Sequence, residues 1–183
     1  MENTPGTSTR KGARRGSSDA IALLSEDHDR VKKLFKQYEK LKDSGSAEEK
    51  ATLAAGICLE LTVHAQVEEE IFYPAVREAI NDDDLMNEAD VEHRSAKDLI
   101  AQIGESDPED EMLDAKVKVL GEYIDHHVKE EEGEMFSKVR KAKVDLAALS
   151  AEMEARKEEL VAEMAPEAAE EPAAASKAKG RTR

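Results

Sequence analysis

The chain has 183 residues, of which 38% are charged and only 3% aromatic, and its net charge is −15. This composition disfavours strand-rich folds, which draw on aromatic and β-branched residues, and it favours helices. The acidic charge argues against nucleic acid as a partner of the protein body, and the single cysteine, Cys58, excludes an internal disulfide and a cysteine-rich metal site. We expect Cys58 to be a small buried side chain on a helix.

Two amphipathic helices are predicted in the first half of the chain. Residues 17–19 offer N-caps for a first helix that runs to about Lys42, and residues 43–46 form a turn. A second helix begins near Ala47, and Pro74 should end or kink it because proline lacks the N–H that an interior helical position needs. The apolar residues of both helices recur at three- and four-residue spacing: Ile21, Leu24, Val31, Phe35, Tyr38, Leu53, Ile57, Leu61, Val67 and Ile71.

Two further helices are predicted in the second half. Residues 81–84 cap a third helix that continues to Gly104, and residues 106–108 start a fourth. An amphipathic stretch over residues 137–164 either extends the fourth helix or follows it. Four helices joined by short turns predict an all-α protein with an up-down-up-down four-helix bundle.

The predicted bundle covers residues 19–145, and a C-terminal helical extension covers residues 146–164. Basic residues 1–18 and the Ala-, Pro- and Lys-rich residues 165–183 are predicted to be disordered tails. The sequence has no apolar stretch of membrane-spanning length and no apolar segment near Met1. We therefore expect a cytoplasmic protein without a membrane partner.

The histidines carry the strongest chemical signal. The chain has five, and each predicted helix carries at least one: His28, His64, His93, His126 and His127. His28, His64, His93 and His127 replace apolar residues on the inner stripes of their helices. Glu68 and Glu131 follow His64 and His127 by four residues, so each pair lies on one helical face.

The same residues are predicted to lie in one layer of the bundle. In an antiparallel helical hairpin, two residues at the same height have their sequence midpoint in the turn, and the midpoints of successive histidines fall in or near the predicted turns. Burying these groups without a partner is costly, and a bound cation removes that cost. Imidazole and carboxylate ligands together suit iron, manganese or zinc.

Each of these residues also has a simpler interpretation. A lone inward histidine is usually a hydrogen-bonded core residue, and glutamate runs such as 68–70 and 130–132 are usually solvated faces. The convergence of the six residues in one layer favours a metal site. The heptad pattern selects His127 as the inward member of its pair, so we place His126 beside the site or on the surface.

The motifs Asp27-His28, His64-x-x-x-Glu68, Glu92-His93 and His127-x-x-x-Glu131 resemble those of the hemerythrin HHE cation-binding family. The resemblance covers about residues 19–145. It implies two non-haem irons bridged by two carboxylates and a solvent-derived oxo or hydroxo group, with Mn or Zn as alternatives. Carried over by position, the terminal ligands are His28, His64, His93 and His127, and the bridges are Glu68 and Glu131.

The sequence departs from respiratory hemerythrins at two positions. Lys97 stands where they have a second histidine on the third helix, and Glu131 stands four residues after its histidine where they have an aspartate at five. The remaining ligands supply about ten of the roughly twelve bonds that two octahedral irons take. The open positions favour binding and reacting with O₂, H₂O₂ or NO over reversible oxygen carriage.

Three functions follow from the sequence. The leading one is a metal- and oxygen-binding protein that binds, senses or detoxifies O₂, H₂O₂ or NO, rather than a dedicated enzyme. The second is an enzyme that consumes peroxide or NO at the same centre. The third is a metal-independent helical interaction protein, with residues 146–164 as the arm of a homodimer.

Overall fold

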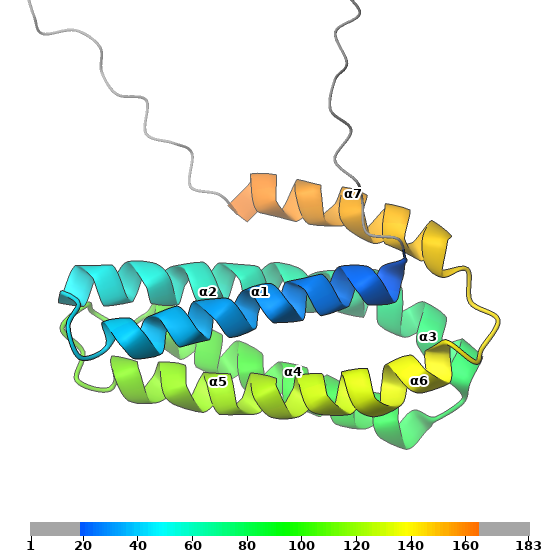
Figure 1. Ribbon diagram of the computed structural model, residues 1–183, viewed down its shortest axis with the longest axis horizontal. Coiled ribbons are helices and arrows are strands. Elements are labelled where there is room, and N and C mark those ends of the chain that lie inside the picture. Colours follow the sequence, from blue (N-terminus) through cyan, green and yellow to red (C-terminus); the bar gives the residue numbers. More distant parts are fainter. Residues whose placement is uncertain (1–18, 165–183) are drawn as a thin grey trace, which may run out of the picture.

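The computed structural model describes residues 19–164, and the two predicted tails lie outside these residues. Helices connected by short loops make up the described part and form an antiparallel bundle (Figure 1), which confirms the predicted fold class. The elements are α1 (Ala20–Leu41), α2 (Ala47–Val67), η1 (Glu68–Phe72), α3 (Tyr73–Ile80), α4 (Asp83–Gly104), α5 (Leu113–Glu130), η2 (Glu131–Met135), α6 (Phe136–Val139) and α7 (Leu146–Met164), where η denotes a π-helical turn.

Three helices begin where capping residues predict. Asp19 accepts a hydrogen bond from the Ala22 N–H at the start of α1, and Asp82 accepts one from the Leu85 N–H at the start of α4. Ser46 and Glu49 form a reciprocal capping box at the start of α2. Such caps satisfy N–H groups that have no partner inside the helix.

Of the two effects expected of Pro74, an end of the second helix is not observed, and the chain instead changes from α-helical to π-helical hydrogen bonding directly before it. The chain passes from α2 through η1 into α3 and stops at Ile80, where Asn81 adopts a left-handed conformation with φ of 51°. The Tyr73 N–H donates to the Glu68 carbonyl five residues back, which widens this turn. Pro74 therefore falls in the first turn of α3, where a missing N–H costs little.

The fourth long helix begins at Leu113 and not at residues 106–108. Asp107 accepts a hydrogen bond from the Glu109 N–H, and Asp110 accepts one from the Met112 N–H. These local bonds give the backbone an alternative to the helix, and so they delay its start. Residues 140–145 separate α6 from α7. The C-terminal helix therefore follows the fourth helix and does not extend it.

Two buried apolar clusters fill the bundle on either side of the histidine layer. One includes Leu24, Phe72 and Met86, and the other includes Val31 and Leu120. On α1, for example, His28 lies between Leu24 of the first cluster and Val31 of the second. The histidine layer is thus sealed along the bundle axis by apolar side chains.

Helix α7 lies across α1 and α2 (Figure 1). Its Met153 and Leu160 are fully buried in the first cluster, and each such burial is worth about 1.5–3 kcal/mol. The predicted homodimer would have to use the exposed face of α7, and it stays a prediction.

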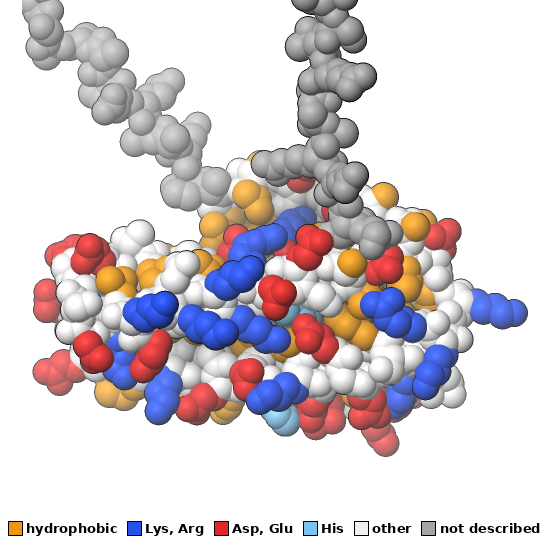
Figure 2. Space-filling view, viewed as in Figure 1, with side chains coloured by type: hydrophobic (Ala, Val, Ile, Leu, Met, Phe, Trp, Pro, Cys, Tyr) orange, Lys and Arg blue, Asp and Glu red, His pale blue; other side chains and the backbone are white. Residues whose placement is uncertain are grey.

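The outer surface carries acidic and basic side chains interspersed over the face that α1, α5 and α7 form (Figure 2). Within residues 19–164, no helix combines the length and the apolar character needed to span a membrane.

Candidate metal centre

The six predicted ligands meet in one layer of the bundle. All are buried, with at most 6% of any of them exposed. They come from six elements of the bundle: His28 from α1, His64 from α2, Glu68 from η1, His93 from α4, His127 from α5 and Glu131 from η2. As the sequence pattern predicts, residues more than a hundred positions apart become neighbours.

The Nε2 atoms of the four histidines point at the two glutamates. His64 Nε2 and His93 Nε2 lie 3.2 and 3.4 Å from Glu68 Oε2. His28 Nε2 and His127 Nε2 lie 3.2 and 3.8 Å from Glu131 Oε2. Each glutamate therefore contacts one histidine from each half of the chain.

The donor atoms form two groups that could each hold a metal ion. His28, His64, Glu68 and Glu131 offer donor atoms within 4.8 Å of one another, and so do Glu68, His93 and His127. Glu68 belongs to both groups, as a carboxylate that bridges two metals would. We refer to these as the first position (His28 and His64) and the second position (His93 and His127).

The outer nitrogen of each histidine faces a further carboxylate. His28 Nδ1 lies 2.8 Å from Glu132, His93 Nδ1 lies 3.0 Å from Glu69, and His127 Nδ1 lies 2.8 Å from Glu92. His64 Nδ1 lies 3.7 Å from Asp27. Carboxylates in this place fix the histidine tautomer and direct Nε2 toward a metal.

Sequence reasoning missed these outer carboxylates. It interpreted the outer members of the glutamate runs as solvated, and Glu69 and Glu132 are indeed partly exposed, yet each binds a histidine. The sequence did contain a signal for them, because each of the four outer carboxylates directly precedes or follows a predicted ligand in the chain.

The two halves of the centre are related by an approximate repeat. Asp27 and His28 recur as Glu92 and His93, while His64, Glu68 and Glu69 recur as His127, Glu131 and Glu132. The interactions repeat as well, since the acid before the first histidine faces the second, and the acid after the glutamate faces the histidine of the other half. The bundle thus surrounds two nearly equivalent positions.

The π-helical turns shape both halves, because η1 begins at Glu68 and η2 begins at Glu131. In an α-helix, residues five apart point about 140° apart around the axis. The wider turn brings them closer to one face, so Tyr73 and Phe136 point inward together with the glutamates.

Tyr73 and Phe136 make the halves chemically different. The Tyr73 hydroxyl lies 3.1 Å from His93 Nε2 at the second position. The Phe136 ring instead stacks parallel to His28 at 6.1 Å at the first position. Tyr73 is a site residue that the sequence analysis did not single out, because an α-helical period places it away from Glu68.

Burial and mutual repulsion raise the free energy of the ionised carboxyl groups of Glu68 and Glu131 in the metal-free protein. Burial and the nearby Glu131 raise the pKa of Glu68 well above its ordinary value. Burial alone would also raise the pKa of Glu131, but His28 and His127 lower it to about 2. Burial lowers the pKa of His64 to about 4, which keeps this imidazole neutral and able to donate a lone pair.

Several inward atoms lack a hydrogen bond of good geometry to any residue within 19–164. These atoms are His28 Nε2, His64 Nε2 and both carboxylate oxygens of Glu68 and Glu131. Buried polar atoms are normally hydrogen-bonded, and a cation is the partner that lone pairs on nitrogen and oxygen share. The donor set therefore fits a pair of metal ions.

A small cavity of about 20 Å³ adjoins the histidines. Apart from the histidines, Asp27 and Lys97, its walls are apolar: Val31, Leu61, Ala65, Ala96, Ile100, Ile124 and Val128. A cavity of this volume holds one water-sized or diatomic molecule.

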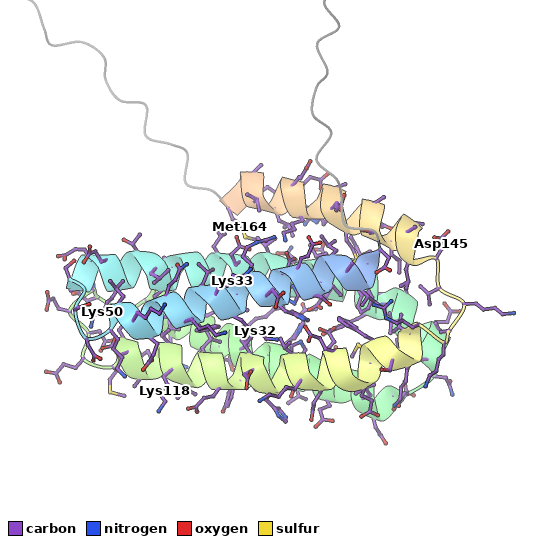
Figure 3. The ribbon with its side chains drawn as sticks, in the orientation of Figure 1. Lys32, Lys33, Lys50, Lys118, Asp145 and Met164 are labelled. Atoms are coloured by element: carbon purple, nitrogen blue, oxygen red, sulfur yellow. The ribbon has the colours of Figure 1, made fainter. Side chains whose placement is uncertain are left out.

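His126 and Lys97 lie at the edge of the centre. The His126 side chain is 62% exposed and pairs with Glu92 and Glu130, in agreement with its predicted place beside the site. Lys97 Nζ lies 2.5 Å from Glu69 Oε2. On the opposite half, Lys32 projects from α1 toward α5 (Figure 3), and its Nζ lies 4.0 Å from Glu132 Oε1.

Comparison with known proteins points to a cation-binding domain. Residues 19–139 match the sequence model of the hemerythrin HHE cation binding domain. The crystal structure of a hemerythrin HHE cation binding domain-containing protein from Mycobacterium kansasii, an Rv2633c homolog, has the same fold, with a TM-score of 0.66 and 23% identity over 79% of this chain and 88% of that one.

A curated relative is the DNA nickase of Nostoc sp. strain PCC 7120, with 27% identity over 135 residues. The match covers 74% of this chain but only 37% of that relative, so the chain spans less than two fifths of its length.

Proposed function

Because this chain belongs to the hemerythrin HHE cation-binding family, we propose that its metal centre holds two non-haem irons and that it binds, senses or detoxifies O₂, H₂O₂ or NO. In this proposal the chain is a metal- and oxygen-binding protein of the cytoplasm rather than a dedicated enzyme. Manganese or zinc could occupy the same donors.

The observation that carries the proposal is the convergence of four imidazole nitrogens on two buried carboxylates. In the proposed centre, His28 and His64 would hold the first metal and His93 and His127 the second, with Glu68 and Glu131 as the carboxylates shared between them. The outer carboxylates hold the imidazoles of His28, His93 and His127 with Nε2 directed inward.

The cavity beside the histidines has the size expected for a small ligand. Its apolar walls and its volume of about 20 Å³ suit a molecule with one or two non-hydrogen atoms, such as O₂, H₂O₂ or NO. A bound iron pair would supply one-electron chemistry and open coordination positions. The Tyr73 hydroxyl, held 3.1 Å from His93 Nε2, can donate a hydrogen bond next to the second position.

An enzyme that consumes peroxide or NO is the alternative that uses the same residues. Turnover by the iron-loaded protein that disappears in the Glu68→Ala variant would favour this alternative. A metal-independent interaction protein would instead keep its stability and its partners after metal removal.

DNA cleavage is named for the longer relative, and we do not extend it to this chain. A protein of net charge −15 is repelled by phosphate groups, so the body offers no electrostatic attraction for DNA. Nicking of supercoiled plasmid by the iron-loaded protein, absent in the His64→Ala variant, would contradict this position.

The direct test is the metal content of the purified full chain after anaerobic reconstitution with Fe²⁺, together with its visible spectrum after exposure to air. We expect about two irons per chain and the absorption bands of an oxygen-bridged pair. His64→Ala and Glu131→Ala should lose iron, while His126→Ala, next in sequence to a ligand but exposed, should retain it. A chain that binds no iron would refute the proposal.

A further inference from the structure

The carboxylate behind His64 differs from the other three outer carboxylates. The Nδ1 atoms of His28, His93 and His127 lie 2.8, 3.0 and 2.8 Å from their carboxylates. The corresponding distance from His64 to Asp27 is 3.7 Å, and His64 Nδ1 has no hydrogen-bond partner within residues 19–164. The approximate repeat is therefore broken at one ligand.

Helix α7 contacts the same carboxylate. Lys157 of α7 forms an ion pair with Asp27 through Oδ1, and Arg30 Nη1 lies 3.0 Å from the same oxygen. Asp27 is 4% exposed and the Lys157 side chain 18%, so solvent screens this interaction only weakly. Both cations contact Oδ1 of Asp27, whereas His64 Nδ1 faces Oδ2.

The equivalent carboxylate in the other half has different neighbours. Glu92 pairs with His127 and with the exposed His126, and α7 lies against α1 and α2 rather than over it. A cation from α7 therefore stands behind the first position and not behind the second.

We propose that α7 makes the two metal positions unequal, because Lys157 holds Asp27 away from His64 and so weakens metal binding at the first position. This inference rests on the proposed two-metal centre. Lys157 acts here as a positioning residue, through Asp27 and His64.

Two physical effects act in the same direction. A carboxylate hydrogen-bonded to the outer nitrogen makes an imidazole a better metal ligand, and loss of such a partner typically lowers metal affinity about 10–100-fold. In addition, a buried ammonium group repels a nearby divalent cation. The second position keeps a close carboxylate behind both of its histidines. Its nearby lysine, Lys97, is 43% exposed and therefore better screened by solvent than Lys157, so the second position should fill first.

The test is a titration of the metal-free full chain with Co²⁺, followed by the visible absorption of bound cobalt. Wild-type protein should bind two Co²⁺ ions in two separable steps. His64→Ala should remove the weaker step and His127→Ala the stronger one, which assigns the steps to the positions.

The informative variant is Lys157→Met, which keeps the aliphatic stem and removes the charge. We expect the weaker step to tighten about tenfold, so that the two dissociation constants approach each other. Lys157→Arg should retain the wild-type ratio. Arg156→Met is the matched control, because Arg156 is the next residue of α7 and pairs with Glu70 instead of Asp27.

Asp27→Asn breaks the same ion pair from the other side and should have the opposite effect. It removes the carboxylate but leaves Lys157 and Arg30, so the weaker step should weaken further. If Lys157 only fastened α7 to the bundle, both variants would shift the weaker step in the same direction.

The outcomes separate the two proposals. Two steps in the wild type that converge in Lys157→Met and diverge in Asp27→Asn support the inference. An unchanged or weaker first position in Lys157→Met, or an equal response of Arg156→Met, overturns it and leaves the two-metal centre intact. A wild-type chain that binds no cobalt overturns both.

Discussion

At the level of single residues, the centre is a costly feature of the metal-free protein. Glu68 is fully buried, and neither of its oxygens has a hydrogen bond of good geometry within residues 19–164. A carboxyl group whose pKa is raised on folding holds a proton that the unfolded chain releases above its ordinary pKa. The folded state therefore loses stability as the pH rises above that value.

Glu68→Gln should accordingly stabilise the metal-free protein at neutral pH, because the amide stays neutral at every pH and the unfolded chain no longer gains free energy by releasing a proton. The same variant should lose the stabilisation that metal confers. Chemical denaturation with and without metal measures both effects. Glu70→Gln, an exposed neighbour that pairs with Arg156, should change stability by less than about 1 kcal/mol. If Glu68→Gln instead destabilised the metal-free protein, the buried carboxyl group of Glu68 would not lower the stability of the folded state.

Cys58 provides a second prediction at this scale. The thiol is buried on α2, as expected from sequence, and burial raises its pKa to about 11. Only the thiolate reacts with alkylating agents, and at pH 8 about one molecule in a thousand carries Cys58 as a thiolate. Alkylation by iodoacetamide should be slow in the folded protein and should rise about tenfold per pH unit up to pH 10. Fast alkylation at pH 8, comparable with that of the denatured chain, would show that the thiol is accessible.

At the level of elements, two features set the geometry of the site. The π-helical turns η1 and η2 turn Tyr73 and Phe136 inward beside Glu68 and Glu131. Helix α7 covers α1 and α2 and places Lys157 on Asp27. The first feature adds residues that lie five positions after each glutamate, whereas the second brings in a residue 130 positions from Asp27.

The docking of α7 depends on a few apolar contacts. Met153→Ala and Leu160→Ala should each destabilise the protein by about 2–5 kcal/mol, because both side chains are fully buried in the first apolar cluster. Val161→Ala changes a side chain on the same helix that is 43% exposed and should have an effect within about 0.5 kcal/mol. Urea denaturation measures all three, and equal losses in the three variants would argue against docking through the buried face.

At the level of the whole molecule, the centre ties together all four long helices of the bundle. Its six residues come from both halves of the chain and lie between two apolar clusters. A metal that binds these residues favours the folded state over the unfolded state, in which the ligands are apart.

Metal loading should therefore raise global stability, by about 2.7 kcal/mol at a free metal concentration one hundred times the dissociation constant. Thermal melts with metal and with a chelator measure the difference. Hydrogen exchange should slow in α1, α2, α4 and α5 together, and His126→Ala should respond as the wild type does. Protection confined to one helical hairpin would argue against a centre shared by both halves.

The sequence alone determined the helical bundle and the set of inward histidines and glutamates. Helical periodicity is a local property, and antiparallel connection by short turns leaves little freedom in which residues share a layer. The sequence alone therefore assigns His28, His64, His93 and His127 to one level of the bundle. The starts of α1, α2 and α4 followed from local caps for the same reason.

The tertiary structure decided what local pattern does not encode. The continuation through Pro74 and the inward turn of Tyr73 depend on a π-helical turn, which changes the period that sequence reasoning assumes. The late start of α5 depends on competing side-chain hydrogen bonds. The contact of Lys157 with Asp27 joins residues 130 positions apart. Periodicity shows which face of α7 is apolar, but only packing selects the surface that this face covers.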